Sequence, residues 1–303
     1  MRICIFGAGS LGSALGGILA GSNQVTLVGR RAHVSAVRKQ GLTLMGDLRR
    51  SVKVEAYERV DGLDPPELLI VTTKAYDTGD AVQACRTLAS RNTMVLTLQN
   101  GLGNLELLRT WKGTNAFGGT TTLGANLVAP GKVRVSGLGE TVIGSDLNPE
   151  GAKRICLLFR ESGLAAKIES DVYAAIWSKV AVSASINPLT AVLRVENGAL
   201  LQSKSMSRMM SEVCREAVLV GIANGVSLSL PEVMKRMRAV SKHTSGNRSS
   251  MLQDVERGRR TEIEQINGAI WNLGERQGSP APLNKALWAM VSALERQGAS
   301  QKA

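Results

Sequence analysis

The sequence predicts an α/β fold in which a parallel sheet with flanking helices is followed by an all-helical C-terminal domain. Up to about residue 170, apolar runs of strand length alternate with helical stretches. From about Asp171 onward, long stretches have helical period and few strand signals. The 303 residues are enough for two hydrophobic cores. We therefore expect two domains, residues 1–170 and residues 171–303.

The first predicted strand, Arg2–Phe6, leads directly into a glycine-rich turn and a helix that continues to Ala20. The turn reads Gly7-Ala8-Gly9-Ser10-Leu11-Gly12. Gly7 permits the tight turn, Gly9 lets a pyrophosphate approach the backbone, and Gly12 lets the helix pack close to the strand. The free N–H groups at the start of the helix would bind the phosphates. Strand, turn and helix together predict a Rossmann-type domain that binds a dinucleotide through these six residues.

The second predicted strand, Val25–Val28, indicates which dinucleotide is bound. An enzyme that uses NAD usually has an Asp or Glu after this strand to bind the ribose 2′-hydroxyl. Here the strand is followed by Gly29, Arg30 and Arg31, with no carboxylate. A guanidinium suits a 2′-phosphate because its planar fork donates two parallel hydrogen bonds. The sequence therefore favours NADP(H), with Arg30 as the expected ligand and Arg31 facing solvent.

Three further apolar runs continue the parallel sheet: Leu68–Thr72, Val95–Leu98 and Phe117–Thr122. In open α/β sheets the ligand lies outside the carboxyl ends of the strands. Lys74, Asn100 and the threonines that end the third run stand at such ends. We therefore expect these side chains on the ligand side of the sheet.

A hairpin is expected to close the first domain. Val133–Val135 and Thr141–Ile143 are short β-type runs, and the five residues between them include Gly137 and Gly139.

The second half carries an unusual polar stripe on one predicted helix. Lys179, Ser183 and Asn187 are spaced four residues apart, which places them on one face. Buried polar side chains need partners, so the stripe either binds a ligand or is satisfied by neighbouring groups. The predicted helices run near Val172–Ser185, Ser205–Asn224, Pro231–Val240, Gly258–Gln277 and Leu283–Arg296.

Composition narrows the function classes. The formal net charge is +12, but Lys and Arg are spread along the chain and aromatic residues make up only 3%. Stacking platforms for bases are therefore scarce, and no nucleic acid partner is expected. An anionic cofactor and an anionic substrate account for part of the positive charge.

The sequence has no pattern of a membrane span, a signal peptide or a common zinc site. No uninterrupted apolar run reaches the roughly 18 residues that a membrane span requires, and no signal-peptide pattern follows Arg2. We therefore expect a cytoplasmic protein with no membrane partner. The four cysteines lie far apart without nearby histidines, which predicts buried thiols, no disulfide framework and no metal site. They are Cys4, Cys85, Cys156 and Cys214.

Reduction of a ketone by a nicotinamide requires a proton donor for the developing alkoxide. The two histidines, His33 and His243, are expected at the surface, and none of the three tyrosines has a lysine four residues later. A lysine whose pKa is lowered by burial, and which a carboxylate holds in place, is the remaining acid. Lys179 is the candidate, with Glu262 as its carboxylate. The alternative is a Lys179 that extends to solvent.

Six motifs, taken in their order, resemble those of the ketopantoate reductase (2-dehydropantoate 2-reductase) family. They are Gly7-x-Gly9-x-x-Gly12, Thr73-Lys74-Ala75, Gln99-Asn100-Gly101, Gly119-Thr120-Thr121-Thr122, Trp177-x-Lys179 with Ile186-Asn187-Pro188-Leu189-Thr190-Ala191, and Ser249-Ser250-Met251-Leu252-Gln253-Asp254 with Arg260-Thr261-Glu262-Ile263. The resemblance covers the whole chain. It implies NADPH-dependent reduction of 2-dehydropantoate to (R)-pantoate, a step of pantothenate and coenzyme A synthesis.

The resemblance also implies roles for individual residues. Lys179 matches the proton donor, and Glu262 matches a residue that contacts both this lysine and the cofactor. The other matches to cofactor-contacting positions are Lys74, Asn100 and Ala125. Positions that bind the carboxylate and hydroxyls of the substrate match Asn187, Asn197, Asn247 and Ser250.

One position departs from the family pattern. Typical members have asparagine four residues after the catalytic lysine, where this chain has Ser183. Serine is shorter and offers one donor, so a contact to a substrate hydroxyl is lost or bridged by water. The reaction class is unaffected, but a different small 2-keto acid, or a 3-hydroxy acid, becomes an alternative substrate. A non-catalytic NADP-binding sensor is the alternative from another class, and a homodimer is a possible assembly.

Overall fold

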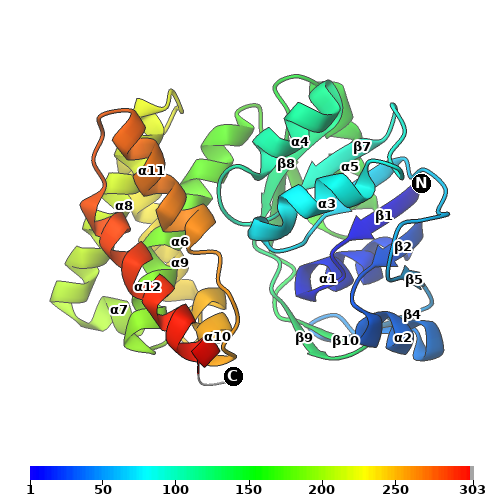
Figure 1. Cartoon of the computed structure of the whole chain (residues 1–303), viewed down its shortest axis with the longest axis horizontal. Helices are drawn as coiled ribbons and strands as arrows, with labels where there is room; N and C mark the ends of the chain where they lie inside the picture. The colour runs from blue at the N-terminus through cyan, green and yellow to red at the C-terminus, as the bar shows by residue number, and fades with distance from the viewer. Residues whose placement is uncertain (301–303) are drawn as a thin grey trace. The chain divides into compact units, whose positions relative to one another are not determined.

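The computed structural model describes residues 1–300 and divides the chain into two compact units (Figure 1). The first unit comprises Met1–Gln99 and Gly103–Val172. The second comprises Asn100–Leu102 and the chain from Tyr173 onward. Each unit has its own cluster of buried apolar side chains.

The first unit is built on an eight-stranded sheet with the order β12-β11-β8-β7-β6-β1-β2-β5. The strands from β5 to β8 are parallel, whereas β11 is antiparallel to β8. This is the strand order of a Rossmann-type fold, with two strands added at one edge. The predicted fold class is therefore confirmed. The strand bounds are β1 Arg2–Phe6, β2 Gln24–Val28, β5 Glu55–Tyr57, β6 Leu68–Val71, β7 Met94–Thr97, β8 Ala116–Thr121, β11 Glu140–Gly144 and β12 Ala165–Ile168.

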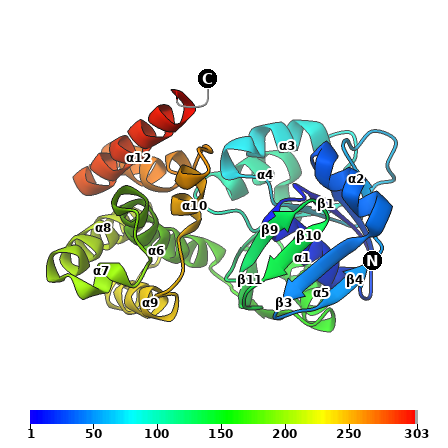
Figure 2. The ribbon, with the colours of Figure 1, turned by 90° about the horizontal axis from the view of Figure 1, so that it is seen from below.

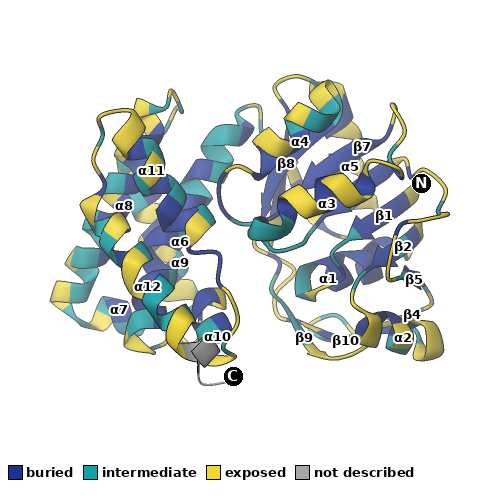
Figure 3. Cartoon of the chain, in the orientation of Figure 1, coloured by how far each residue is buried: buried dark blue, intermediate teal, exposed yellow. Residues whose placement is uncertain are grey.

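Helices cover both faces of this sheet, which explains why its central strands are apolar throughout. In Figure 2, α3 and α4 lie on one side of β1, and α1 and α5 lie on the other. All four residues of β6 and of β7 are buried, as strands covered on both faces must be (Figure 3). The helices are α1 Ser10–Leu19, α2 Arg31–Gln40, α3 Thr78–Cys85, α4 Asn104–Lys112 and α5 Pro149–Glu161, with short 3₁₀ turns η1 Ala75–Asp77 and η2 Gly113–Asn115.

The predicted hairpin is wrong. Its first strand, β10 Lys132–Val135, pairs with β3 Leu42–Gly46 and β9 Ala125–Ala129 in a second sheet of order β4-β3-β10-β9, which β4 Arg50–Val52 completes. Its second strand is β11 of the main sheet. Gly137 and Gly139 both have positive φ, and the chain between these strands crosses from one sheet to the other. Each strand thus buries its own valines in a separate sheet.

Every regular element described after residue 171 is helical, as predicted. The bounds are α6 Val172–Leu193, α7 Ala199–Gln202, α8 Lys204–Ala223, α9 Leu230–His243, α10 Ser250–Glu256, η3 Glu264–Gly268, α11 Ala269–Arg276 and α12 Pro282–Ser300. The element η3 is a single turn of π-helix.

Two predicted helices differ from the structure. The helix expected to end at Ser185 continues through Pro188 as α6. The helix expected over Gly258–Gln277 begins only at η3, because Gly258 adopts positive φ and ends α10 instead. The stretch from Gly258 to Ile263 is therefore irregular, and it carries the buried Glu262.

Among the described helices, α6 alone is long and apolar enough to cross a membrane by length and composition. Its most apolar window is 61% buried inside the structure. Ala181, Ala184 and Ala191 are fully buried in the core of the second unit. These properties are those of the core helix of a helical domain.

All four cysteines are buried and free, as predicted. Burial raises the pKa of the Cys4 thiol to about 12 and that of Cys214 to about 11. Cys4, Cys85 and Cys156 belong to the first unit and Cys214 to the second. Within residues 1–300, no group of three or more His, Cys, Asp or Glu side chains could hold a metal ion.

Candidate functional site

The three glycines of the predicted dinucleotide turn differ in how tightly they are packed. Gly7 adopts φ +105°, and a Cβ there would lie 2.5 Å from the backbone nitrogen of Thr73. A Cβ on Gly12 would lie 2.4 Å from the carbonyl oxygen of Gly7. Gly9 differs, because a Cβ there would approach no atom more closely than 3.9 Å. Gly7 and Gly12 are therefore required by packing, whereas Gly9 leaves open space beside the start of α1.

The N-terminus of α1 has no side-chain cap. Gly9 caps the helix without a side-chain hydrogen bond, and the described first turn contains no acidic residue. Ser10, the first residue of the helix, accepts a hydrogen bond through its hydroxyl from the Leu127 N–H in β9 at 2.9 Å. This contact fixes β9, and thus Ala125 at its start, beside the first turn of α1.

Arg30 and Arg31 stand where the sequence predicts, immediately after β2. Arg30 caps the N-terminus of α2 with extended backbone angles, and Arg31 is the first residue of that helix. Both side chains are exposed. Two cations at a helix N-terminus, where the helix dipole is also positive, form a suitable environment for a phosphate dianion.

His33 is buried, which corrects the surface position expected from the sequence. It is 5% exposed. Its Nδ1 accepts a hydrogen bond from the Gly131 N–H at 3.1 Å, so the ring proton belongs on Nε2, which donates to Ser13 Oγ at 3.0 Å. Burial lowers the pKa of His33 below its usual value of 6.5. This neutral imidazole joins α1, α2 and the turn before β10, a role that the sequence did not reveal.

Gln99 holds the loop that carries Lys74. Its Nε2 donates to the carbonyl oxygen of Thr73 at 3.0 Å and to Thr78 Oγ1 at 2.9 Å. Its Oε1 accepts from Thr97 Oγ1 at 2.9 Å. The half-buried Lys74 thus follows a strand end that Gln99 makes rigid. The sequence includes Gln99 in a motif but does not indicate this role.

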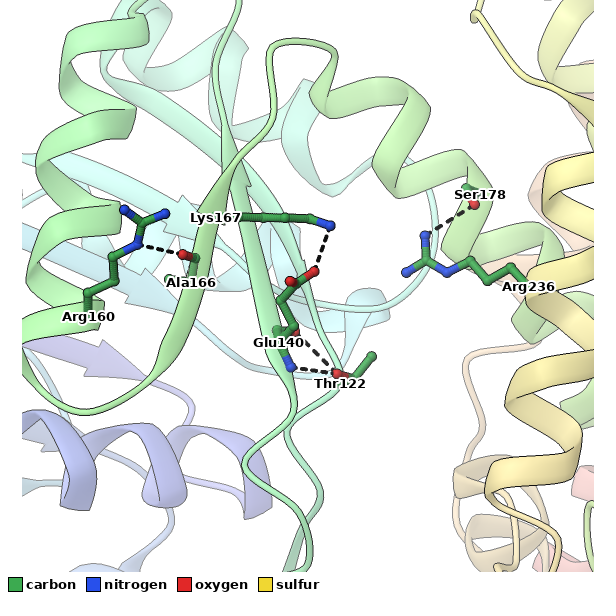
Figure 4. A network of polar contacts seen from close by, with 7 residues as sticks. All are labelled: Thr122, Glu140, Arg160, Ala166, Lys167, Ser178 and Arg236. Atoms are coloured by element: carbon green, nitrogen blue, oxygen red, sulfur yellow. Dashed lines mark hydrogen bonds and ion pairs between the residues drawn. The ribbon is translucent and has the colours of Figure 1, made fainter.

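Two of the threonines that end the third predicted strand make hydrogen bonds toward β11. Thr121 Oγ1 lies 2.9 Å from Thr141 Oγ1 on the neighbouring strand. Thr122 Oγ1 accepts from the Glu140 N–H at 2.8 Å, and the Glu140 carboxylate pairs with Lys167 at 2.7 Å (Figure 4). These hydroxyls join β8 to β11.

In the second unit, the predicted polar stripe lies along α6. Lys179, Ser183 and Asn187 are each half-buried, while Val180, Ala184 and the other residues between them are mainly buried. The helix therefore presents one polar face within an otherwise apolar surface.

Lys179 and Glu262, the predicted acid and its carboxylate, interact electrostatically. Burial lowers the pKa of Lys179 from 10.5 to about 8, the Glu262 carboxylate opposes this shift, and Arg236 adds to it. Arg236 is held near α6 by a 3.4 Å contact between its Nη1 and Ser178 Oγ (Figure 4). Burial therefore outweighs the carboxylate, and Lys179 is a stronger acid than an ordinary lysine.

Glu262 is in turn held by Asn100. Glu262 is 6% exposed, and Asn100 Nδ2 donates to its Oε2 at 3.2 Å. Asn100 follows β7 in the sequence but groups with the second unit. The next residues fix this segment, because the Leu102 N–H donates to the Gln265 carbonyl oxygen at 2.9 Å and a Cβ on Gly101 would lie 2.7 Å from the same oxygen.

The remaining predicted substrate residues form a second polar group. The Asn197 N–H donates to the Asn247 carbonyl oxygen at 3.0 Å, and Asn197 Nδ2 donates to Thr244 Oγ1 at 2.8 Å. Asn197 is buried, yet its Oδ1 has no hydrogen-bond partner within residues 1–300. Ser250 begins α10 and is exposed, as is Asn247. Ser249, which precedes Ser250, connects α10 to α6 because its hydroxyl accepts a hydrogen bond from Thr190 Oγ1 at 2.8 Å.

Comparison with protein families matches both units. Residues 3–148 match the family model described as ketopantoate reductase PanE/ApbA, and residues 171–295 match ketopantoate reductase PanE/ApbA C terminal. A 2-dehydropantoate 2-reductase from Pyrococcus horikoshii is 38% identical, with all of both chains covered.

Solved structures give the same family together with a related activity. A PanE/ApbA family ketopantoate reductase from Ralstonia eutropha has a TM-score of 0.92 and 30% identity, covering 98% of this chain and 99% of its own. D-mandelate dehydrogenase with NADH and anilino(oxo)acetate has a TM-score of 0.93 and 29% identity, with the same coverage.

The fold, the glycine turn and these matches define the class: the protein is an oxidoreductase that uses a nicotinamide dinucleotide. The similarity over the full length is more specific than this class. The chain belongs to the ketopantoate reductase family.

Proposed function

We propose that this protein reduces 2-dehydropantoate to (R)-pantoate with NADPH, in pantothenate synthesis. The observation that carries the proposal is the Lys179–Glu262 pair, in a chain similar over its full length to 2-dehydropantoate 2-reductases. The pair supplies the acid that ketone reduction requires, and the polar residues around it suit a small hydroxylated 2-keto acid.

The nicotinamide, when bound, supplies the hydride to C2 of the keto acid. Lys179 donates a proton from Nζ to the oxygen on C2. Its pKa of about 8 suits this role, because the amine is still protonated near neutral pH and gives up its proton more readily than an ordinary lysine. Glu262 stabilises the ammonium form before transfer, and Asn100 holds Glu262 in position.

The cofactor-binding residues follow from the local geometry. The pyrophosphate would lie against the open N-terminus of α1, within the turn Gly7–Gly12. Arg30 would bind the 2′-phosphate, which makes NADPH the preferred form. Lys74, Asn100, Ala125 and Glu262 would complete the contacts to the dinucleotide.

The substrate contacts are assigned to amides and hydroxyls of the second unit. Asn197 offers a buried Oδ1 that can accept a hydrogen bond from a substrate hydroxyl. Asn187, Asn247 and Ser250 would bind the carboxylate and the remaining hydroxyl group. Ser183 faces the same side of α6 as Lys179, so it is placed to influence which side chain of the keto acid is accepted.

The experiment that tests this function is oxidation of NADPH by the purified protein with 2-dehydropantoate. Other branched 2-keto acids and NADH serve as comparisons. Preference for 2-dehydropantoate and NADPH is expected. No oxidation with any 2-keto acid would overturn the proposal and would favour a non-catalytic NADP-binding sensor.

A second candidate is reduction of a different 2-keto acid with the same chemistry. The resemblance implies an amide at the position where this chain has Ser183, and one similar solved structure is D-mandelate dehydrogenase. If a bulkier 2-keto acid is the better substrate, Ser183→Asn should shift the ratio of kcat/KM values toward 2-dehydropantoate. An unchanged ratio would remove Ser183 as the cause. The cytoplasmic location and a homodimer stay predictions.

A further inference from the structure

The helix that carries Lys179 contains a proline where a hydrogen-bond donor is needed. Pro188 lies inside α6 and has no N–H, so it cannot donate to the carbonyl oxygen of Ala184 four residues earlier. Ala184 is fully buried, so water does not readily replace the missing donor. The gap lies between Ser183 and Asn187, the two residues that form the polar stripe together with Lys179.

Asn267 supplies the missing donor. This residue belongs to η3 and is fully buried. Its Nδ2 donates to the carbonyl oxygen of Ala184 at 3.1 Å. An amide from another element thus replaces the hydrogen bond that the backbone of α6 cannot make.

The orientation of the Asn267 amide is fixed by a chain of contacts that ends at a carboxylate. Glu216 on α8 accepts hydrogen bonds from the backbone N–H groups of Leu283 and Asn284, each at 3.0 Å. Glu216 Oε2 also accepts from Asn284 Nδ2 at 2.9 Å, and that Nδ2 donates to the Val213 carbonyl oxygen at 3.2 Å. The Nδ2 of Asn284 faces these two acceptors. The Oδ1 of Asn284 therefore points the other way, toward Asn267.

Asn284 Oδ1 accepts from Asn267 Nδ2 at 3.0 Å. The Nδ2 of Asn267 therefore faces two acceptors, Asn284 Oδ1 and the Ala184 carbonyl oxygen. The reversed amide would place an oxygen against both. The Oδ1 of Asn267 accepts no hydrogen bond from any residue within the described chain. The two hydrogen bonds that Nδ2 donates therefore orient the side chain by themselves.

Asn267 also lies close in sequence to the carboxylate that faces Lys179. The Ile266 N–H donates to the carbonyl oxygen of Glu262 at 3.1 Å, and the Gly268 N–H donates to that of Ile263 at 3.0 Å. These backbone hydrogen bonds make Glu262 and Asn267 parts of one compact turn. One amide thus joins the turn that carries Glu262 to the helix that carries Lys179.

We propose that Asn267 is a positioning residue for the reduction: by donating to Ala184 in place of Pro188, it sets the course of α6 and holds Lys179 against Glu262. The proposal rests on the proposed function, since it concerns the same acid. Asn267 itself is not assigned any contact with substrate or cofactor.

The decisive experiment is a double-mutant cycle of Asn267→Leu and Pro188→Ala. In the natural background, Asn267→Leu should lower kcat by about 10²-fold, the loss that a displacement of about 1 Å produces, with little change in KM for NADPH. Pro188→Ala restores a backbone N–H that can donate to Ala184, so in this background the loss should shrink at least about tenfold. Equal losses in both backgrounds would overturn the proposal.

A second measurement does not depend on turnover. Acylation of Lys179 by an amine reagent, followed by mass spectrometry of its peptide across pH, reports the pKa of this amine directly. The midpoint, the pH at which acylation of Lys179 reaches half of its maximal rate, should be about 8 in the natural protein. It should fall in Asn267→Leu, because Lys179 loses the carboxylate that raises its pKa, and recover in the double variant. An unchanged midpoint in a folded Asn267→Leu would refute positioning. If the natural protein reduces no 2-keto acid but the midpoint shifts as expected, the proposed function fails, while the positioning of Lys179 against Glu262 by Asn267 stands.

The far end of the chain of contacts provides a milder variant in case Asn267→Leu does not fold. Glu216→Gln would place an amide NH₂ against donors and weaken the orientation of Asn284. Glu212→Gln, one turn earlier on α8, is the matched control, since Glu212 pairs only with Arg215 at 3.3 Å among the described contacts. Glu216→Gln should lower kcat and the Lys179 midpoint, and Glu212→Gln should change neither. Identical behaviour of the two variants would overturn the role of this chain of contacts.

Discussion

At the scale of single residues, the protein depends on side chains whose environments change their ordinary chemistry. Lys179 is a lysine made more acidic by burial, and His33 is a histidine kept neutral by burial. Neither property could be derived from the sequence, because burial depends on elements distant along the chain. The identity of Lys179 as a candidate could be derived, because no histidine or tyrosine stood in a suitable motif.

Replacement of Lys179 tests the acid directly. Lys179→Ala should lower kcat for reduction by about 10²- to 10⁴-fold, the usual contribution of a positioned general acid. In the natural protein, only the ammonium form can donate, so the reduction rate should fall as pH rises through about 8. Glu262→Gln removes the charge that raises this pKa, so the fall should move to lower pH. A pH profile that is the same in Glu262→Gln would contradict the pairing.

Replacement of Arg30 tests cofactor choice. Arg30→Ala should raise KM for NADPH by about 10- to 100-fold, since a hydrogen bond to a charged group contributes about 1.5–3 kcal/mol. KM for NADH should change little, because NADH has no 2′-phosphate. Lys39→Ala, an exposed cation at the other end of α2, is the control. Similar effects on both cofactors would remove the argument for NADPH.

Replacement of His33 tests a pH-dependent contribution to stability. Because the folded pKa of His33 lies below 6.5, the unfolded chain binds a proton at higher pH than the folded chain does. Stability should therefore fall as pH drops below about 6.5. Denaturant unfolding of His33→Gln on both sides of this pH should show a smaller fall than in the natural protein. His243→Gln, at an exposed site, should behave like the natural protein.

At the scale of elements, local patterns were predictable and pairings between distant segments were not. The turn from Gly7 to Gly12 was predictable because its residues, its strand and its helix are contiguous. The predicted hairpin was wrong because short valine-rich strands suit either sheet, and β10 and β11 are directed to different partners. The length of α6 was also missed. A proline usually ends a helix because it leaves a carbonyl oxygen without a backbone donor. Here the distant Asn267 donates to that oxygen, on Ala184.

The packing of α1 provides a prediction at this scale. Gly12→Ala should destabilise the protein by about 1–3 kcal/mol, the usual cost of overpacking. The added methyl group would lie 2.4 Å from the Gly7 carbonyl oxygen and 2.5 Å from Thr72 Oγ1. NADPH binding should weaken as well, because the turn must move. Gly79→Ala is the control, since nothing lies within 4 Å of its Cβ position. Equal unfolding midpoints for the two variants would contradict the packing argument.

At the scale of the whole molecule, the main feature is the positive charge of the protein. The formal net charge is +12, and although Lys and Arg occur along the whole chain, the segment from Arg30 to Lys53 has seven basic residues and one acidic residue. This basic segment includes Arg30, the residue assigned to the 2′-phosphate. The keto acid is also an anion, so both reactants carry charge opposite to that of the protein.

The charge predicts a dependence on salt. A positive surface raises the rate at which anions arrive, and added salt screens it beyond about 8 Å at physiological ionic strength. Added sodium chloride should therefore lower kcat/KM for NADPH while leaving kcat at saturation nearly unchanged. The salt effect should weaken when Arg31, Arg49 and Lys53 are replaced together by Gln. A salt effect confined to kcat would contradict electrostatic attraction of the cofactor.

The burial of every cysteine turns the thiols into built-in reporters of local opening. Native thiols with raised pKa react slowly with alkylating reagents, so labelling requires transient exposure. Cys4, Cys85 and Cys156 lie in one unit and Cys214 in the other. Alkylation rates, resolved by peptide, would therefore measure how often each unit opens, without any introduced label. NADPH should slow the first three rates, and a keto acid analogue should slow the fourth.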